Sequence, residues 1–171
     1  MGLRKGHCYT RVKRAYTRKS KFKKHGFIKA VPKSKIVRYD MGDLNKQFNR
    51  KLELVTKDEI QLRHNSLESA RIVVNRQLHE MFGMNYFFKV LVFPHQVLRE
   101  NKVLTGAGAD RMQTGMQQAF GKAVGIAARV RKGQSIFSIK VNEENVDKAK
   151  AALKKAGPRM PGKFSIVISK I

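Results

Sequence analysis

Hydrophobic and polar residues alternate, or branched and aromatic residues cluster, in six short stretches of the chain, and each stretch predicts a β-strand. The predicted strands are Lys35–Met41, Leu52–Thr56, Tyr86–Phe93, Gly125–Val130, Ser135–Val141 and Phe164–Ser169. Pro94 ends the most apolar of them, Tyr86–Phe93, which is typical of a central strand. Gly133 in the turn 131–134 predicts a hairpin between the two strands that flank it.

Residues 66–81 are predicted to form an amphipathic helix, because their apolar residues recur at intervals of three or four. The apolar residues are Leu67, Ala70, Val74, Leu78 and Met81. Asn65 is placed to cap the helix, and Glu68 completes a capping box with it. Gly83 ends the helix.

A second helix is predicted after Asn142, which can act as its cap. Glu143 and Glu144 stand in its first turn, where the helix dipole favours anions. Its apolar stripe is formed by Val146, Ala149, Leu153 and Ala156. Gly157 and Pro158 then form a stop signal.

The order of these elements predicts an α+β protein. Each helix has one apolar stripe, so both helices are expected to cover one face of a single mixed sheet in a two-layer sandwich. The region 97–122 lacks a hydrophobic period, apart from a short helical piece within 111–122. A long internal loop over 101–116 is therefore expected in a domain that spans 40–171.

Charge divides the chain into two parts. It has 171 residues, 42% of them hydrophobic, which is enough for one core, and a formal net charge of +25. Residues 1–39 hold 14 Lys and Arg but no acid, and the first acid is Asp40. Residues 1–39 therefore form a basic N-terminal extension that cannot fold by burying apolar surface, and a polyanion is the expected partner.

Twelve of the fourteen cations of this extension are the candidate phosphate contacts. They are Arg4, Lys5, Arg11, Lys13, Arg14, Arg18, Lys19, Lys21, Lys23, Lys24, Lys35 and Arg38. Aromatic rings lie among them at Tyr9, Tyr16, Phe22 and Phe27, which suits stacking on bases or packing into folded RNA. A solubilising or membrane-surface tail, a free-standing RNA chaperone or RNA-modifying enzyme, and an architectural DNA binder remain alternatives on charge alone.

Nothing in the chain favours catalysis or a cofactor. Gly115 and Gly121-Lys122 are separated by five residues where a phosphate-binding Walker loop has four, and Ala123 replaces its Ser or Thr. No two histidines have metal-ligand spacing, and His79 is expected on an exposed helix flank. A lone Cys8 excludes an internal disulfide and fits a reducing compartment. No membrane span, secretory signal or homo-oligomer is expected.

The long loop is the second candidate binding element, because loops of this length inside a compact domain are often functional. Gly106, Gly108 and Gly115 would let the backbone approach a ligand closely. The candidate contacts are Lys102, Thr105, Gly106, Gly108, Arg111, Gln113 and Thr114. A surface excursion without a specific contact is the alternative.

Five blocks, in order, resemble the ribosomal protein family called L-ten-e in archaea and eukaryotes, the counterpart of bacterial L-sixteen. They are AVPKSKIVRYDMG (30–42), SLESARIVVNR (66–76), FPHQVLRENK leading into GAGADRMQTGMQQAFGK (93–122), GQSIFSIK (133–140) and MPGKFSIVISK (160–170). The chain ends at Ile171 without the long C-terminal extension of the eukaryotic members, so an archaeal-type protein is expected.

The resemblance implies a specific role. Such a protein is a structural component of the large ribosomal subunit, in the cytoplasm, and not an enzyme. It binds large-subunit rRNA near the peptidyl-transferase centre, beside neighbouring ribosomal proteins and the A- and P-site tRNAs. The family fold is an α+β sandwich of hammerhead type. The loop that matches 101–116 is expected to face the P-site tRNA, while the basic extension threads into rRNA.

Overall fold

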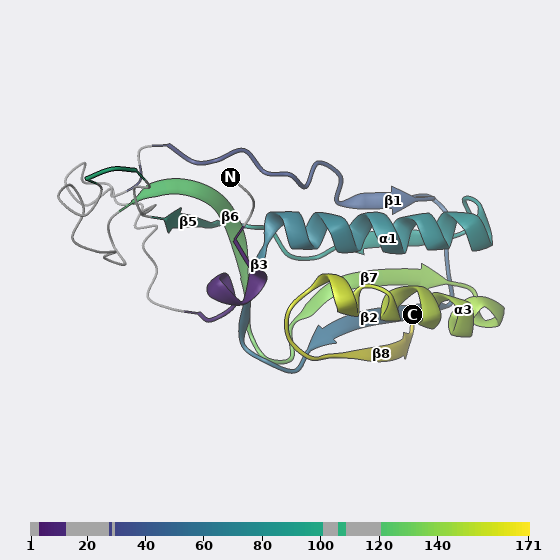
Figure 1. Cartoon of the computed structure of the whole chain (residues 1–171). Coiled ribbons are helices and arrows are strands. Elements are labelled where there is room, and N and C mark those ends of the chain that lie inside the picture. The colour runs from purple at the N-terminus through teal and green to yellow at the C-terminus, as the bar shows by residue number, and fades with distance from the viewer. Residues whose placement is uncertain (1–3, 13–27, 29, 101–105, 109–120) are drawn as a thin grey trace, which may run out of the picture.

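A computed structural model gives the fold of the chain (Figure 1). The structure describes residues 4–12, 28, 30–100, 106–108 and 121–171. The helical piece expected within 111–120 lies outside these residues. In chain order the elements are the 3-10 turn η1 (Gly6–Tyr9), β1 (Asp40–Gly42), β2 (Arg50–Thr56), β3 (Ile60–Arg63), α1 (His64–Phe82), β4 (Phe87–Val90), β5 (Gln96–Glu100), β6 (Lys122–Val130), β7 (Ser135–Val141), η3 (Glu143–Asn145), α3 (Val146–Lys154), η4 (Gly157–Arg159) and β8 (Phe164–Lys170).

Five strands form the larger sheet, in the order β1-β4-β7-β2-β8. Each neighbouring pair is antiparallel. Ile139 in β7 is the register partner of Leu52 in β2 and of Phe88 in β4. Residues opposite one another point to the same face, so these three apolar side chains form one row across the sheet.

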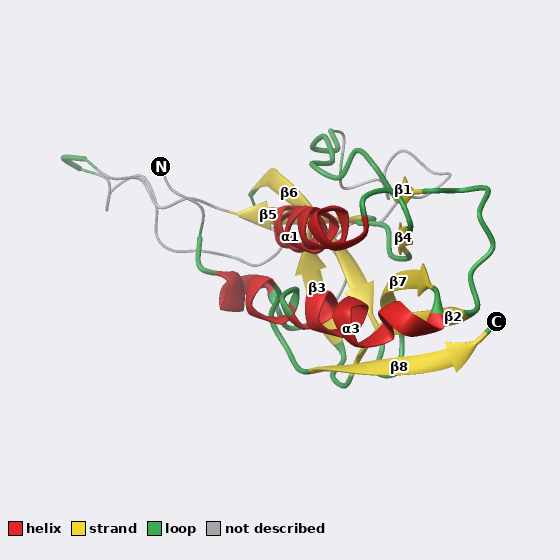
Figure 2. Ribbon diagram, turned by 90° about the vertical axis from the view of Figure 1, so that its right-hand side faces the viewer, coloured by secondary structure: helices red, strands yellow, loops and turns green. Residues whose placement is uncertain are grey.

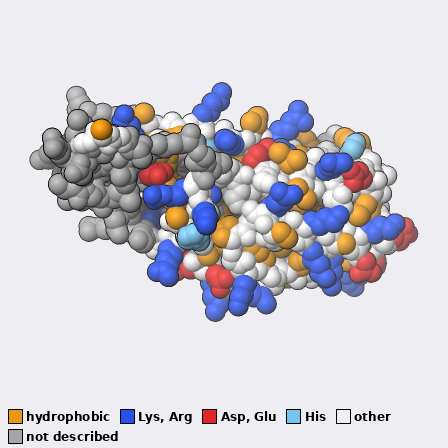
Figure 3. Space-filling model, in the orientation of Figure 1, with side chains coloured by type: hydrophobic (Ala, Val, Ile, Leu, Met, Phe, Trp, Pro, Cys, Tyr) orange, Lys and Arg blue, Asp and Glu red, His pale blue; other side chains and the backbone are white. Residues whose placement is uncertain are grey.

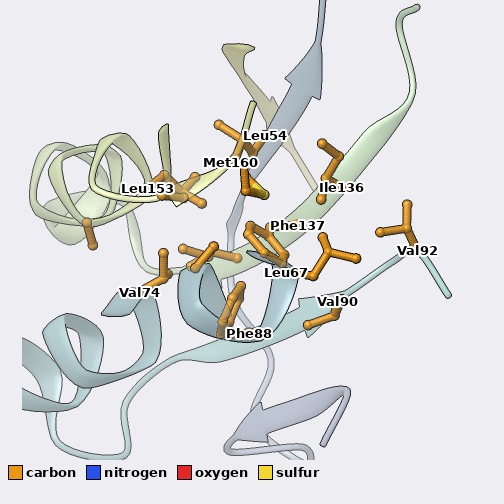
Figure 4. Packing of buried hydrophobic residues seen from close by; sticks show 14 of the residues in the cluster. Leu54, Leu67, Val74, Phe88, Val90, Val92, Ile136, Phe137, Leu153 and Met160 are labelled. Carbon is orange, nitrogen blue, oxygen red and sulfur yellow. The ribbon is translucent and has the colours of Figure 1, made fainter. Parts of the chain in front are cut away.

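Both helices, α1 and α3, lie on that apolar face (Figure 2). The buried residues of α1 are Leu67, Ala70, Val74 and Leu78, and those of α3 are Ala149, Ala152 and Leu153. These side chains meet the sheet residues in one core, where the rings of Phe88 and Phe137 pack edge to face with their centroids 5.4 Å apart (Figure 4). The predicted two-helix layer is therefore confirmed. Met81, which the sequence predicts in the stripe of α1, is exposed, and Phe82, one residue further on and four after Leu78, packs against the core instead.

The protein has two antiparallel sheets where the sequence predicts a single mixed sheet. The second sheet is the smaller one. It consists of β3, β6 and β5 in that order, again with antiparallel pairing. The predicted hairpin is wrong for the same reason, because β6 pairs with β3 and β5 while β7 pairs with β2 and β4. The turn at Gly133 instead bonds to the end of β2, through the N–H of Gly133 and the carbonyl of Thr56, 2.9 Å apart.

Several predicted boundaries also need correction. The strand expected over Lys35–Met41 is reduced to β1, since residues 35–39 run along the molecule without regular strand pairing. The short strands β3 and β5 were missed, and β5 lies inside a stretch that lacks hydrophobic alternation. The remaining predicted strands are confirmed in position, with ends that differ by up to three residues.

The N-terminal caps expected from sequence do not form, whereas Gly83 ends the first helix as predicted. The first helix begins at His64, one residue before Asn65. The side chain of Asn65 accepts a bond only from the adjacent N–H of Ser66. Glu68 pairs with Arg71 rather than with the N-terminus of the helix. Asn142 precedes the short turn η3, and α3 starts after it, with no bond from the Asn142 side chain.

Replacing Phe88 by Ala should lower the free energy of unfolding by about 3–5 kcal/mol, because it removes a fully buried ring and leaves a cavity beside Phe137. The matched control is Phe87→Ala, on the opposite face of the same strand, where the ring is only half-buried. The control should cost less than half as much in urea unfolding. Equal losses for the two variants would contradict the assigned core face.

Candidate nucleic-acid interface

The long internal loop starts and returns at one closed root. Glu100, the last residue of β5, is the register partner of Lys122, the first residue of β6. The guanidinium group of Arg99 donates two bonds, of 3.1 and 3.2 Å, to the carbonyl of Gly121. The described piece Gly106–Gly108 lies at the same end of the molecule as this root, away from α3 (Figure 1).

The N-terminal segment 4–12 docks beside this root. The N–H of Gln61 in β3 donates to the carbonyl of Thr10 (2.9 Å), and its side-chain amide donates to the carbonyl of Tyr9 (3.0 Å). The hydroxyl of Tyr9 donates to a carboxylate oxygen of Glu100 (2.8 Å). Burial, and then this bond to Glu100, raise the pKa of Tyr9 to about 12, so its hydroxyl stays protonated. One carboxylate thus ties the N-terminal segment to the base of the loop.

Two arginines complete this contact. Arg4 pairs with Glu100 at 3.4 Å, and Arg63 donates to the carbonyl of Arg4 (3.1 Å) while its guanidinium lies over the ring of Tyr9. Tyr9 is therefore used inside the chain, which corrects the expectation that its ring is available to stack on bases. Arg4 keeps a side chain that is 42% exposed, and Lys5 and Arg11 are exposed.

Residues 30–39 run along the outside of α1, with Ile36 buried and its neighbours Lys35 and Val37 exposed (Figure 1). Arg38 is also exposed. The N–H of Lys35 donates to Nδ1 of His64 (3.3 Å), which requires a neutral ring. Burial, and then the charges of Lys35 and Arg63, lower the pKa of His64, so the ring remains an acceptor at neutral pH.

Of the predicted contacts in the extension, the structure therefore describes Arg4, Lys5, Arg11, Lys35 and Arg38. The remaining candidates lie outside the described residues: Lys13, Arg14, Arg18, Lys19, Lys21, Lys23 and Lys24 in the extension, and Lys102, Thr105, Arg111, Gln113 and Thr114 in the loop, together with Gly115 and the rings of Tyr16, Phe22 and Phe27.

Two predicted loop glycines are described, and one has the backbone that glycine favours. Gly108 has φ +75°, in the left-handed region, and Gly106 has φ +155°, at its margin. A Cβ atom at either position would meet no described atom within 4 Å. None of the described atoms therefore crowds the backbone at these two glycines.

Sequence reasoning missed the residues that hold this end together. Glu100, Arg63, Gln61 and His64 were not singled out, because each is an isolated polar residue whose partner is distant along the chain. Tyr9 and Glu100, for example, are 91 residues apart.

No group of three or more potential metal ligands occurs within the part of the chain that the structure describes. His79 lies on the exposed flank of α1, as predicted, with its Nδ1 3.0 Å from the carbonyl of Gly83. Among the described helices, none is long and apolar enough to cross a membrane.

A compact α+β body with an acid-free extension and a glycine-containing loop at one end is typical of a basic, structural nucleic-acid-binding protein.

Comparison with known proteins gives the particular family. The family model described as "Ribosomal protein L16p/L10e" matches residues 12–167. The chain is 51% identical to "Large ribosomal subunit protein uL16" of Methanococcus aeolicus, over 99% of this chain and 96% of the relative. The proteins of the same name from Methanoculleus marisnigri and Methanocella arvoryzae are 49% and 48% identical, each over 91% of this chain and 89% and 88% of their own length.

The chain belongs to the L16p/L10e family of ribosomal proteins. It is therefore a structural protein of the ribosome, in the cytoplasm, and not an enzyme. The relatives compared are archaeal, in agreement with the archaeal type expected from sequence.

Lowering the pH should destabilise the protein through His64. Its pKa is lower in the folded than in the unfolded chain, so the unfolded chain takes up the proton more readily once the pH falls below the ordinary value of 6.5. The free energy of unfolding should therefore fall between about pH 7.5 and about pH 5.5, and this fall should be smaller in His64→Gln. His79→Gln, at an exposed histidine, is the control, and it should leave the fall in the free energy of unfolding as large as in the unchanged protein. An unchanged pH dependence in His64→Gln would refute the assignment.

Proposed function

We propose that the chain is a structural component of the large ribosomal subunit that binds large-subunit rRNA near the peptidyl-transferase centre and helps to position A- and P-site tRNA. The observation that carries the proposal is the match, over nearly the whole chain, to proteins named as large-subunit components. The partners are large-subunit rRNA, neighbouring ribosomal proteins and the two tRNAs.

The basic extension supplies most of the affinity in this proposal. Its cations neutralise rRNA phosphates and release counterions. Residues 13–24, which hold seven of the candidate cations, directly follow the docked segment 4–12 in the sequence. Docking at Gln61 and Glu100 fixes the point from which these cations start, and this reduces the conformational entropy that the segment loses on binding.

The body supplies placement. Structured RNA is recognised mainly through shape and backbone rather than base edges, and a rigid two-sheet body is suited to that task. The loop is the tRNA-facing element in this proposal, because its root lies beside the docked segment 4–12 and no described atom crowds Gly106 or Gly108.

The affinity test uses two triple variants with the same loss of charge. Lys21, Lys23 and Lys24 are changed to Gln in one variant, and the exposed body residues Lys57, Lys132 and Lys163 in the other. Binding to large-subunit rRNA is measured over a range of salt concentrations. Each phosphate contact contributes about 0.7–0.9 to the slope of log K against log salt. The first variant loses three contacts, so its slope should be smaller by about 2. The second should change it much less, and equal changes would refute the role of the extension.

The loop test replaces residues 104–110 by a Gly-Ser segment of equal length, and a second variant deletes them. Ribosomes should still incorporate both variants, since the root at Arg99 and Gly121 lies outside the altered residues. Binding of P-site tRNA and the rate of translation should fall in both. Lost incorporation, with normal translation by the ribosomes that remain, would show instead that the loop serves assembly.

A further inference from the structure

We propose that the exposed face of α3 is a second phosphate-binding surface, which docks on the backbone of a double-helical RNA segment distinct from the RNA held by the extension. This inference rests on the proposed function, since it assigns a further contact to the same RNA-bound protein. The surface, called the α3 basic face below, consists of Lys148, Lys150, Lys154 and Lys155 around Ala151.

The helix geometry places these residues on one side. At 100° per residue, they span an arc of about 160° centred near Ala151. Ala149, Ala152 and Leu153 occupy the opposite side and are fully buried. Lys148, Lys154 and Lys155 are exposed, whereas Lys150 is half-buried at the margin of the arc. Asp147 is the acid that shares the arc, so the face carries a net charge of about +3.

Six acids of the body form ion pairs with cations outside the face, whereas Glu144 and Asp147, which lie next to it in sequence, form no ion pair among the described residues. Six ion pairs form among the described residues, and none uses a lysine of the α3 basic face. On the larger sheet Lys51 pairs with Glu53, and Lys89 pairs with Asp40. Lys155 only donates to the neutral amide oxygen of Gln77 on α1, a bond that holds the two helices together and leaves its charge uncompensated. Figure 3 shows Lys and Arg side chains over this part of the molecule, with Asp and Glu side chains among them.

Lys148 lies in the first turn of α3, beside Asp147 and four residues after Glu144, whereas Lys154 and Lys155 lie at the last turn, where the helix dipole favours cations. None of these three exposed lysines forms an ion pair among the described residues. A phosphate backbone in front of the α3 basic face would satisfy all the exposed lysines at once.

The composition of the face selects the kind of partner. The arc contains no aromatic ring on which single-stranded bases could stack. Ala151 near its centre adds little bulk, and the face extends for about 10 Å from Lys148 to Lys155 at 1.5 Å per residue. Lysines spaced along an exposed helix face suit the regular phosphate backbone of an RNA duplex. The face lies at the end of the molecule away from the loop root, so it contacts a different RNA segment (Figure 1).

The affinity test uses two charge-reversed double variants of the full chain. Lys148→Glu with Lys154→Glu removes two cations of the face, and Lys57→Glu with Lys132→Glu makes the same change at exposed turns. The salt slope for large-subunit rRNA should fall by about 1.5 in the first variant, and affinity at low salt should fall about tenfold or more. The control should change by less than a third of this. Equal effects would overturn the inference.

A second measurement locates the contact. A hydroxyl-radical probe is tethered to the thiol introduced by Ala151→Cys in a Cys8→Ser background, and a matched probe is tethered at Lys57→Cys in the same background. The probe at position 151 should cut rRNA in a duplex that neither the matched probe nor a probe at Cys8 of the natural sequence cuts. The absence of cuts from position 151, or protection of the face by a ribosomal protein instead of RNA, would overturn the inference. If the unmodified chain failed to bind rRNA at all, the proposed function would fail instead.

Discussion

An excess of cations is the constraint on which the rest of this molecule depends. With 37 basic and 12 acidic residues, most positive charges have no acidic partner within the chain. The fold tolerates this because its stability comes from apolar packing on one face of the larger sheet, where Phe88, Phe137 and the two helices exclude water. The acids are left to pair with selected cations at the sheet and at the N-terminal segment. The remaining charge repels itself until a polyanion neutralises it.

Glu100 shows how a single acid can organise a basic region. It stands at the end of β5, accepts a bond from Tyr9 and pairs with Arg4, while its register partner Lys122 begins the returning strand. The same carboxylate therefore joins the start of the basic extension to the root of the loop. Two segments that the sequence presents as separate binding elements consequently start from one place. Loss of this carboxylate would remove both the ion pair of Arg4 and the acceptor of the Tyr9 hydroxyl.

The sequence predicted what depends on local pattern. The stripes of both helices, apart from Met81 and from Ala156 beyond the end of α3, follow from periodicity and are confirmed, as are the strand Ser135–Val141 and the α+β class. The division into two sheets could not be predicted, because β6 and β7 have the same apolar composition whether they pair with each other or with different strands.

Which cations remain unpaired also depends on contacts between distant residues. Arg4 reads as one more free cation in an acid-free segment, yet it reaches Glu100, and Tyr9 does the same.

The two-layer fold also determines where a second RNA contact could be built. The core is on one face of the larger sheet, so the helices that cover it must turn their polar sides outward, and α3 is the shorter and more basic of the two. In α1 the exposed Arg76 pairs with Glu80, one turn later, whereas no ion pair among the described residues uses a lysine of α3. Ala149 and Leu153 lock α3 onto the sheet. A helix held against the sheet in this way keeps its lysines at fixed positions, which suits the regular phosphate backbone of a duplex.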